Sequence, residues 1–394
     1  MGAGEEAGHD AISRAIIESA LAEVQSVGQA DFAVERVAKG AFCSVGAVYE
    51  RWSDRRALLA ELARGPITSG IKAGLANADS ATSAVTWMLT DGRTQLLLAS
   101  EIILAGGNAT EVREPAIDVW NELESGLARH MSPAIAWYVA TYAVGNALLG
   151  ALGVTLEDEH QGRVRWLSDV CSDADLSNRR GYREVSPHAV NVPTLPSPSR
   201  TDEVSLALIS AAQLLLSERG AEGATTRHIA AGAGVTTGAL YRRYDGKSRL
   251  MADVLLTQLE PDRYAWTWEL VQALASEDPV GQSASILANR MVEVAGDLPA
   301  QQVLLQVGVA ARNDPMLRAQ VVERIRIAQD ARADMIRHFV DAGILRDDIA
   351  PAVLAWGFQV VPVGIRATLP LGTPLEPAKV AAATEVLLES SMTR

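Results

Sequence analysis

Cysteine, histidine and aromatic residues are scarce in this chain of 394 residues. It has two cysteines, Cys43 and Cys171, six histidines and four phenylalanines. Neither the cysteines nor the histidines have the spacing of metal ligands, so we expect free, mostly buried thiols and no metal or cofactor. No uninterrupted apolar stretch reaches the ~18 residues of a membrane span, and the Gly-rich, acidic start lacks the features of a signal peptide. We therefore expect a cytoplasmic protein without a membrane role.

Catalytic motifs are missing as well, since no Gly-rich phosphate loop precedes a predicted helix and no nucleophile motif is present. The chain is instead rich in Ala, Leu, Val and Ile at helical spacing, with 48% hydrophobic residues. No alternating strand pattern recurs between turn signals, which predicts an all-α protein. The net charge of −13 excludes a protein that coats nucleic acid over its whole surface, so any DNA contact must be confined to a local patch.

The chain contains an internal repeat. Asp10–Arg64 aligns without a gap on Asp202–Leu256 at a constant offset of 192, and about fifteen positions are identical. A repeat of this length and period predicts two related modules in one polypeptide rather than a solenoid. The domains expected from it are a repeated N-terminal unit in each half, a longer helical domain after each unit, and a Pro-rich linker between the halves: 10–64, 65–171, 172–200, 201–256 and 257–394.

The second copy has the pattern of a helix-turn-helix. A helical apolar stripe over residues 205–219 ends at Gly220, and Thr225 can cap a short second helix. After a Gly-containing turn, Thr236 can cap a third helix, and Lys247 opens a fourth. Helix, tight turn and helix is the arrangement that reads DNA in many regulators. The same geometry also occurs in helical hairpins that bind nothing.

Residues 224–250 closely resemble the DNA-binding domain of TetR-family transcriptional regulators. The resemblance implies that Tyr241 and Lys247 hold phosphates and that Thr236 and Thr237 face base edges. From Arg227 to Arg249 five basic residues stand against one acidic residue, which favours DNA in an acidic protein. The candidate DNA contacts in this copy are Thr225, Thr226, Arg227, Thr236, Thr237, Tyr241, Arg242, Arg243 and Lys247.

The first copy keeps the helical frame but changes the chemistry. Ala33 and Val34 replace the Thr pair, and Phe42-Cys43 replaces the Gly-Val turn. Five basic residues face three acidic ones over residues 35–57, so attraction to DNA should be weaker. Two interpretations stay open, a second reader with different base preference and a decayed unit kept for packing. The candidate contacts are Ser44, Val45, Tyr49, Arg51, Arg55 and Arg56.

A second similarity follows each unit, with Gln95–Arg113 aligned on Ala300–Arg318 at an offset of 205. In TetR-like proteins the helices of this region surround a cavity for a small-molecule effector, which implies a pocket in the second half. Core packing would explain apolar residues there equally well. The candidate ligand residues are Trp266, Trp268, Met291, Gln306, Arg312 and Trp356.

Two long helices expected near 133–152 and 351–369 are apolar on nearly all sides and must be buried by partners. In TetR-like proteins such helices form the dimer interface, so the resemblance implies a pseudo-dimer formed within one chain. The interpretation is a ligand-responsive regulator, more consistent with a repressor, that binds double-stranded DNA through two unequal units and an asymmetric operator. Its main alternative is a protein-interaction or effector-binding regulator that does not bind DNA, and association of several chains stays open.

Overall fold

Helices form nearly all of the regular secondary structure in the described part of the chain. The computed structural model describes residues 2–156, 159–172, 201–258, 265–274, 276–373 and 375–392. Within these ranges the only bridge between extended residues joins Leu345 to Met392. The all-α prediction is confirmed for these residues. Residues 173–200, which make up nearly all of the expected linker, lie outside them.

The first half begins with four helices that match the repeated unit, α1 (Gly2–Val27), α2 (Val34–Gly40), α3 (Val45–Tyr49) and α4 (Arg55–Leu62). A short π-helical segment, η1 (Ala63–Ile67), contains Pro66 and leads directly into the next helix. The helices that follow are α5 (Thr68–Ala76), α6 (Ala81–Leu89), α7 (Arg93–Asn108), α8 (Thr110–Leu127), α9 (Pro133–Ala151) and α10 (His160–Ser172).

The second half repeats the order with α11 (Glu203–Gly223), α12 (Thr226–Gly232), α13 (Thr237–Tyr241) and α14 (Lys247–Gln258). The later helices are α15 (Ala265–Leu274), α16 (Pro279–Gly296), α17 (Leu298–Ala311), α18 (Pro315–Asp341), α19 (Pro351–Thr368), η4 (Leu369–Leu371) and α20 (Pro377–Ser391). Gly220 interrupts α11 with a φ of 68°, which agrees with the helix end expected at this residue.

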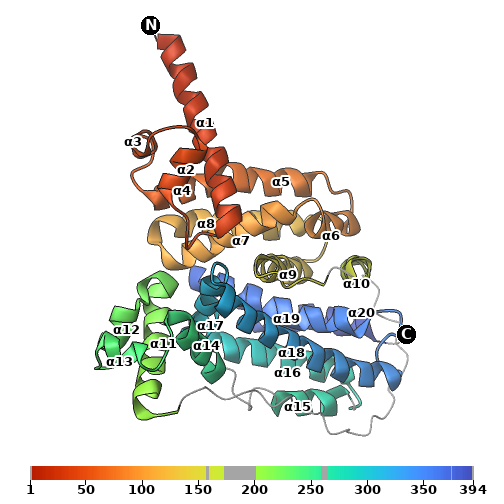
Figure 1. Cartoon of the computed structure of the whole chain (residues 1–394). Helices are drawn as coiled ribbons and strands as arrows, with labels where there is room; N and C mark the ends of the chain where they lie inside the picture. The colour runs from red at the N-terminus through yellow and green to blue at the C-terminus, as the bar shows by residue number, and fades with distance from the viewer. Residues whose placement is uncertain are drawn as a thin grey trace.

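The two sets of helices are stacked with α9 and α10 between them (Figure 1). Helix α9 packs along α19, and α10 and α20 extend this contact. Two glycines allow the backbones of α9 and α19 to approach closely. A Cβ atom at Gly145 would lie 1.9 Å from the carbonyl oxygen of Val360, and one at Gly364 would lie 2.0 Å from that of Thr141.

The apolar helices α9 and α19 are largely covered by the rest of the protein. By length and composition, Pro133–Ala151 and Pro351–Leu371 could each cross a membrane, but 67% and 61% of their apolar windows are buried. Burial on this scale is what a helix without a polar face requires. Their apolar character is therefore explained by the contact between the first and second halves.

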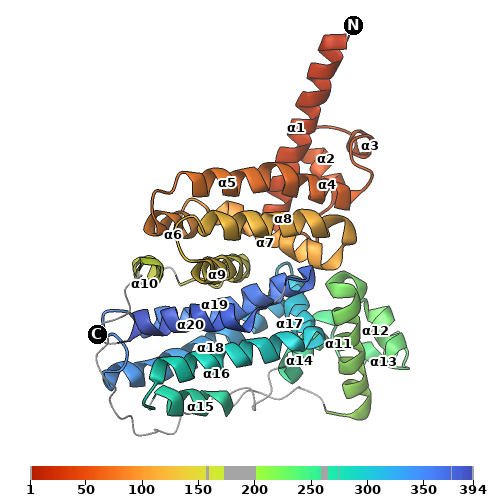
Figure 2. The same cartoon turned by 180° about the vertical axis from the view of Figure 1, so that it is seen from behind.

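The two repeated units lie on the same side of the molecule. Figures 1 and 2 place α3 on one end of that side and α13 on the other, with the inner ends of α1 and α11 between them. Helix α1 also projects outward beyond the rest of the protein. This arrangement leaves the turn and third helix of each unit at the periphery.

Candidate nucleic-acid interface and effector cavity

We call helices α1–α4 unit 1 and helices α11–α14 unit 2. In unit 2 the Thr225 hydroxyl accepts a hydrogen bond from the His228 amide at 3.3 Å, and the Thr236 hydroxyl accepts one from the Ala239 amide at 3.2 Å. Both contacts begin a short helix by satisfying an amide that has no partner within it. The cap expected at each threonine is therefore present.

Unit 1 keeps only one of these two caps. The Ser44 hydroxyl accepts from the Ala47 amide at 3.1 Å, whereas Ala33 leaves the start of α2 without a side-chain cap. The turn also differs, because Phe42 has a φ of 54° where Gly234 has a φ of 67°. A left-handed conformation suits glycine and strains phenylalanine. The Phe42 side chain is 98% exposed, so packing does not compensate for this strain.

Part of each candidate DNA face is open to solvent. Tyr241 is 54% exposed and its repeat equivalent Tyr49 is 46% exposed. The other exposed candidates are Thr225, Arg227, Thr236 and Arg242 in unit 2 and Ser44 and Arg56 in unit 1, while Thr226, Thr237 and Val45 are half-buried. Hydroxyl and guanidinium groups at these positions can donate to phosphate oxygens.

Arg51 and Arg243 occupy equivalent positions and brace the third helix of their units. Arg51 donates from Nε to the Ser13 hydroxyl at 3.0 Å and from Nη1 to the carbonyl of Ala47 at 2.8 Å. Arg243 donates from Nε to Asp202 at 3.0 Å. The hydrogen bond from the Ser205 hydroxyl and this contact with Arg243 together lower the pKa of Asp202 to about 2. Arg51 therefore connects the end of the third helix to Ser13 within α1, and Arg243 connects it to Asp202 at the start of α11.

Arg55 and Lys247 form a second equivalent pair with an internal contact. Arg55 Nη2 donates to the carbonyl of Gln29 at 2.9 Å, and Lys247 Nζ donates to the carbonyl of Ala221 at 2.6 Å. Burial lowers the pKa of Lys247. Lys247, which is expected to hold a phosphate, therefore donates to a carbonyl of its own unit, directly after the interruption of α11 at Gly220.

The sequence analysis missed the residues that attach each unit to the helices behind it. In unit 1 the Gln29 amide donates to Glu101 Oε2 of α7 at 2.7 Å, and in unit 2 the Ala221 amide donates to Gln306 Oε1 of α17 at 2.9 Å. Gln29 and Ala221, which supply the amides, are aligned by the repeat offset of 192. Glu101 and Gln306, which accept, are aligned by the second offset of 205. The second offset could have identified Glu101, because it aligns this residue with a candidate already chosen.

We call these two contacts the latches. Each follows a glycine in the left-handed region, Gly28 with a φ of 79° and Gly220 with a φ of 68°. A Cβ atom at Gly28 would lie 3.0 Å from Glu101 Oε2, and one at Gly220 would lie 3.1 Å from Gln306 Oε1. Glycine is thus required at both positions by the backbone conformation and by the approach of the latch side chain.

Each latch is also tied to the opposite half of the chain. Arg312 forms an ion pair with Glu101 and donates from Nη2 to the carbonyl of Gln25 at 2.7 Å. Gln306 donates to Asn108 of α7 at 3.4 Å. The exposed Glu222 of unit 2 pairs with Arg55 of unit 1 at 3.0 Å. Hydrogen bonds and ion pairs therefore connect each unit and its latch to the opposite half of the chain.

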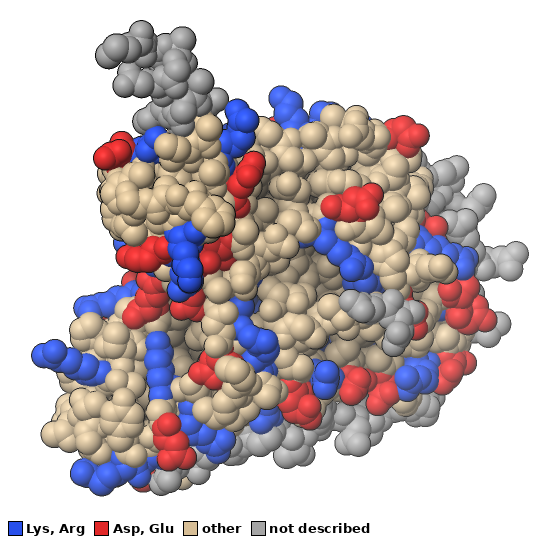
Figure 3. All heavy atoms as spheres, turned by 45° about the horizontal axis from the view of Figure 1, so that its top comes forward, with Lys and Arg blue, Asp and Glu red and all other residues tan. Residues whose placement is uncertain are grey.

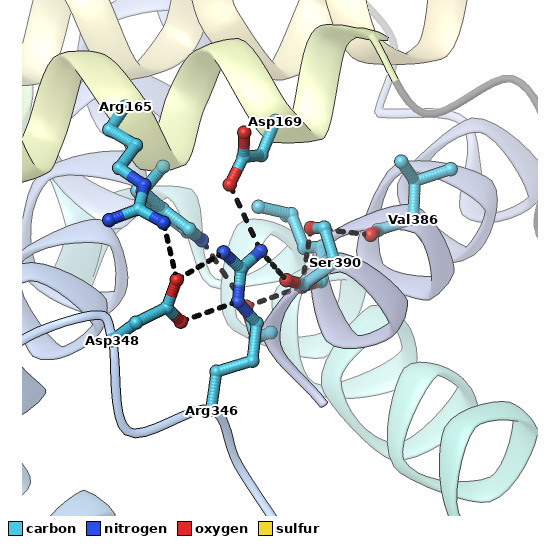
Figure 4. A network of polar contacts seen from close by, with 9 residues as sticks. Arg165, Asp169, Arg346, Asp348, Val386 and Ser390 are labelled. Atoms are coloured by element: carbon cyan, nitrogen blue, oxygen red, sulfur yellow. Dashed lines mark hydrogen bonds and ion pairs between the residues drawn. The ribbon is translucent and has the colours of Figure 1, made fainter. Parts of the chain in front are cut away.

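A second polar network joins the halves at the other end of the interface (Figure 4). Arg346 donates to Asp169 of α10 at 3.0 Å and to both oxygens of Asp348 at 2.8 Å, and it also donates to the carbonyl of Ser390 at 3.1 Å. Arg165 of α10 reaches Asp348 at 2.6 Å. The guanidinium of Arg346 lowers the pKa of the Asp348 carboxyl.

A cavity of about 340 Å³ lies mainly among α16, α17, α18 and α19, with α7, α9 and the end of α1 at its border. Its size falls in the range of small-molecule sites. Of the ligand candidates, Met291 and Arg312 line it, whereas Gln306 forms the unit 2 latch and Trp356 is buried and donates to Asn146 at 3.0 Å. The side chains of Trp266 and Trp268 lie outside the described residues.

The surface charge is mixed on the face shown in Figure 3. Basic side chains project from the lower left, while acidic side chains gather between the upper and lower parts on the same side. A mixed surface fits a protein whose net charge is −13 and whose positive charge is local. The basic side chains do not form a continuous patch on this face.

Residues 208–254, within unit 2, match the family model described as bacterial regulatory proteins, tetR family. Unit 2 is TetR-like in sequence. Two relatives are each an HTH-type transcriptional repressor AcnR, from Corynebacterium diphtheriae and Corynebacterium glutamicum, at 25% and 24% identity. The matches span 42% and 43% of this chain and 80% and 83% of the relatives. Both relatives are therefore similar to this chain over less than half of its length.

One solved structure is similar to part of the chain. It is SmeT, the repressor of the Stenotrophomonas maltophilia multidrug efflux pump SmeDEF, with 22% identity and a TM-score of 0.29. The match covers 40% of this chain and 72% of SmeT.

Proposed function

We propose that this protein is a ligand-responsive transcriptional repressor whose two halves form a pseudo-dimer within one chain. The observation that carries the proposal is the pair of equivalent units on one side of the molecule, each attached by an equivalent latch. The contact of α9 with α19 supports the intramolecular pairing. We take domains 10–64 and 201–256 as the two DNA-binding units, 65–171 and 257–394 as their helical partners, and 172–200 as the linker.

The two units are proposed to contribute unequally to DNA binding. Unit 2 offers Tyr241, Arg227 and Arg242 on its exposed face. Unit 1 has Glu35 and Glu50 at the positions equivalent to the two arginines, and a negative charge there opposes contact with phosphate. An operator with two dissimilar half-sites would suit this pair, since each recognition helix would enter its own major groove.

Ligand control would act through the geometry of the two units. The cavity borders Gly28, Glu101 and Arg312, which belong to the unit 1 latch and its support. A ligand that binds better to one placement of the units shifts the population toward that placement, and only this difference in affinity counts. The proposal places the effector next to the latch rather than on the DNA face.

The decisive experiment compares DNA binding by matched variants of the exposed tyrosines. Genomic fragments selected by the protein at moderate salt would be titrated with the wild type, with Tyr241→Ala and with Tyr49→Ala. We expect Tyr241→Ala to weaken binding at least tenfold, equivalent to about 1.4 kcal/mol, and Tyr49→Ala to have a smaller effect. Arg337→Gln serves as control, because this exposed arginine pairs locally with Asp334 on α18.

Lys247→Ala belongs in the same titration because its role has two parts. Loss of its contact with Ala221 should weaken the folded unit as well as any contact with phosphate. Thermal unfolding of this variant separates the two effects. Failure to select any genomic fragment, or unchanged binding by the Tyr241 variant, would favour the protein-interaction alternative, in which the units serve only as a scaffold.

A further inference from the structure

The lining of the large cavity has an unusual charge balance. Its described lining includes one acidic residue, Glu101 of α7, and five arginines. The arginines come from α16, the C-cap of α17, α18 and α19: Arg290, Arg312, Arg324, Arg332 and Arg366. The whole chain has 48 acidic residues against 35 basic ones, so the charge balance of this lining is opposite to that of the chain. A cationic cavity within an acidic protein indicates an anionic ligand.

Two of these arginines have carboxylate partners. Arg312 pairs with the buried Glu101, and Arg290 pairs with Glu293 at 2.6 Å, a carboxylate that is itself 69% exposed. Arg332 donates to the side-chain amide of Gln359, and Arg366 donates to that of Gln301 at 2.6 Å. An amide carbonyl holds a guanidinium in place without cancelling its charge. These two contacts orient both arginines at the cavity.

Arg324 is the clearest anion-binding candidate. Its Nη1 atom is shielded from solvent, and no hydrogen-bond partner is recorded for it within the described part of the chain. A buried donor without an acceptor destabilises a folded protein, and the effect is larger when the group is charged. A carboxylate or phosphate oxygen in the cavity would satisfy this donor, and arginine suits both because of its planar fork of N–H groups.

The remainder of the cavity is apolar. Leu148 and Leu149 of α9, Leu287 of α16, and Phe358 and Val363 of α19 all line it. A small inorganic anion would leave these side chains facing empty space or water. The cavity therefore fits a molecule that has an anionic head and an apolar body.

We propose that the effector cavity binds an amphipathic anion, with the head held by Arg324 and the apolar body packed between α9, α16 and α19. This inference rests on the proposed function, because it specifies the ligand class of the same regulator. Carboxylates and phosphate monoesters share the recognising chemistry, and the experiment separates them.

The test uses the full-length protein and three probes with the same ten-carbon chain. Decanoate, decyl phosphate and 1-decanol are titrated by calorimetry, with inorganic phosphate as the head group alone. We expect one or both of the anions to bind at least tenfold more tightly than 1-decanol, and inorganic phosphate to bind weakly. The order of decanoate and decyl phosphate identifies the head group. Equal affinity for 1-decanol and both anions, or no binding by any straight-chain acid from six to twelve carbons, would overturn the proposal.

The matched variants are Arg324→Gln and Arg326→Gln. Both residues lie on α18, but Arg326 is exposed and does not line the cavity. Arg324→Gln should weaken binding of the anion at least tenfold without changing that of 1-decanol, while Arg326→Gln should leave both unchanged. Circular dichroism and urea unfolding verify that each variant is folded. Equal affinity of wild type and Arg324→Gln for the anion would contradict the assignment of the head group site.

DNA titration in parallel separates this inference from the proposed function. Selective binding of the anion by a protein that selects no DNA would leave the ligand class standing and refute the repressor. DNA binding by a protein that does not distinguish anion from alcohol would refute the ligand class alone. An anion that binds and also changes the affinity for DNA would support both.

Discussion

At the scale of single residues, equivalent positions of the repeat have kept their geometry while their chemistry has changed. Arg55 and Lys247 donate to the carbonyl groups of Gln29 and Ala221, although one is an arginine and the other a lysine. The latch acceptors differ more, because a charged carboxylate holds unit 1 where a neutral amide holds unit 2. The two units therefore depend on electrostatics to different degrees.

The latch difference leads to a prediction about stability. Glu101→Ala should destabilise the protein by about 3 to 5 kcal/mol, because it leaves the buried Arg312 without its carboxylate. Gln306→Ala should cost about 1 to 3 kcal/mol, the typical effect of leaving a buried amide unsatisfied. Urea unfolding of both variants provides the comparison. A smaller loss for Glu101→Ala than for Gln306→Ala would show that the ion pair does not support unit 1.

At the scale of helices, the crossing of α9 and α19 depends on glycine. Gly145→Ala would place a methyl group 1.9 Å from the carbonyl oxygen of Val360, whereas nothing lies within 4 Å of a Cβ atom at Gly150 on the same helix. We expect Gly145→Ala to cost about 2 to 3 kcal/mol by forcing the helices apart. Gly150→Ala should stabilise α9 by roughly 0.5 to 1 kcal/mol, because alanine favours helix. Chemical denaturation measures both, and equal effects would contradict the close crossing.

The polar network beside α10 predicts a dependence on pH. Because ion pairs with Arg346 and Arg165 lower the folded-state pKa of Asp348, its contribution to stability is present above the unfolded value of about 3.9. That contribution is lost as the pH falls through the lowered folded pKa. Asp348→Asn should therefore destabilise the protein by about 0.5 to 1 kcal/mol at pH 7, a small effect because the carboxylate is 38% exposed.

Unfolding measurements at acidic pH test whether the charge on Asp348 stabilises the protein. The difference in unfolding free energy between wild type and Asp348→Asn should shrink when urea unfolding is repeated from pH 5 to pH 2. A difference that is constant over this range would mean that packing, and not the charge on Asp348, is responsible. Asp347→Asn is the control, since this exposed neighbouring carboxylate is not among the acceptors given for Arg165 and Arg346.

At the scale of the whole molecule, one chain is predicted to occupy one operator. Native mass spectrometry of the protein with its selected DNA should give a ratio of one chain to one duplex. Hydroxyl-radical footprinting should show two protected segments on one face of the duplex, about 34 to 36 Å apart, with different sequences. Two chains on one duplex, or a footprint with perfect dyad symmetry, would contradict the single-chain pseudo-dimer.

The helix boundaries of unit 2 were predictable because they depend on local chemistry. Thr225 and Thr236 begin helices and Gly220 interrupts one in the structure as in the sequence analysis. The hydrogen-bond partners of the basic side chains were not predictable in the same way. Arg51, Arg243 and Lys247 were expected on the DNA face, but each has a hydrogen bond within its own unit that only the folded backbone reveals.

The residues that line the cavity were also only partly predictable from the sequence. Met291 and Arg312 were chosen from their residue type and do line it, whereas Trp356 turns to Asn146 and Gln306 to Ala221. Arg324, Arg332 and Arg366 are spread over α18 and α19, and nothing in their spacing connects them. Their common position is a consequence of how these two helices pack.

The sequence by itself determined the helical class, the repetition of a unit, the places where its short helices begin, and the chemical difference between its copies. These features depend on periodicity, capping groups and glycine, all of which act over a few neighbouring residues. Only the tertiary structure decided which side chains are held internally, that Glu101 and Gln306 are equivalent latches, and that five arginines share one cavity. Those outcomes depend on contacts between residues far apart in the chain, which the close crossing of α9 and α19 brings together.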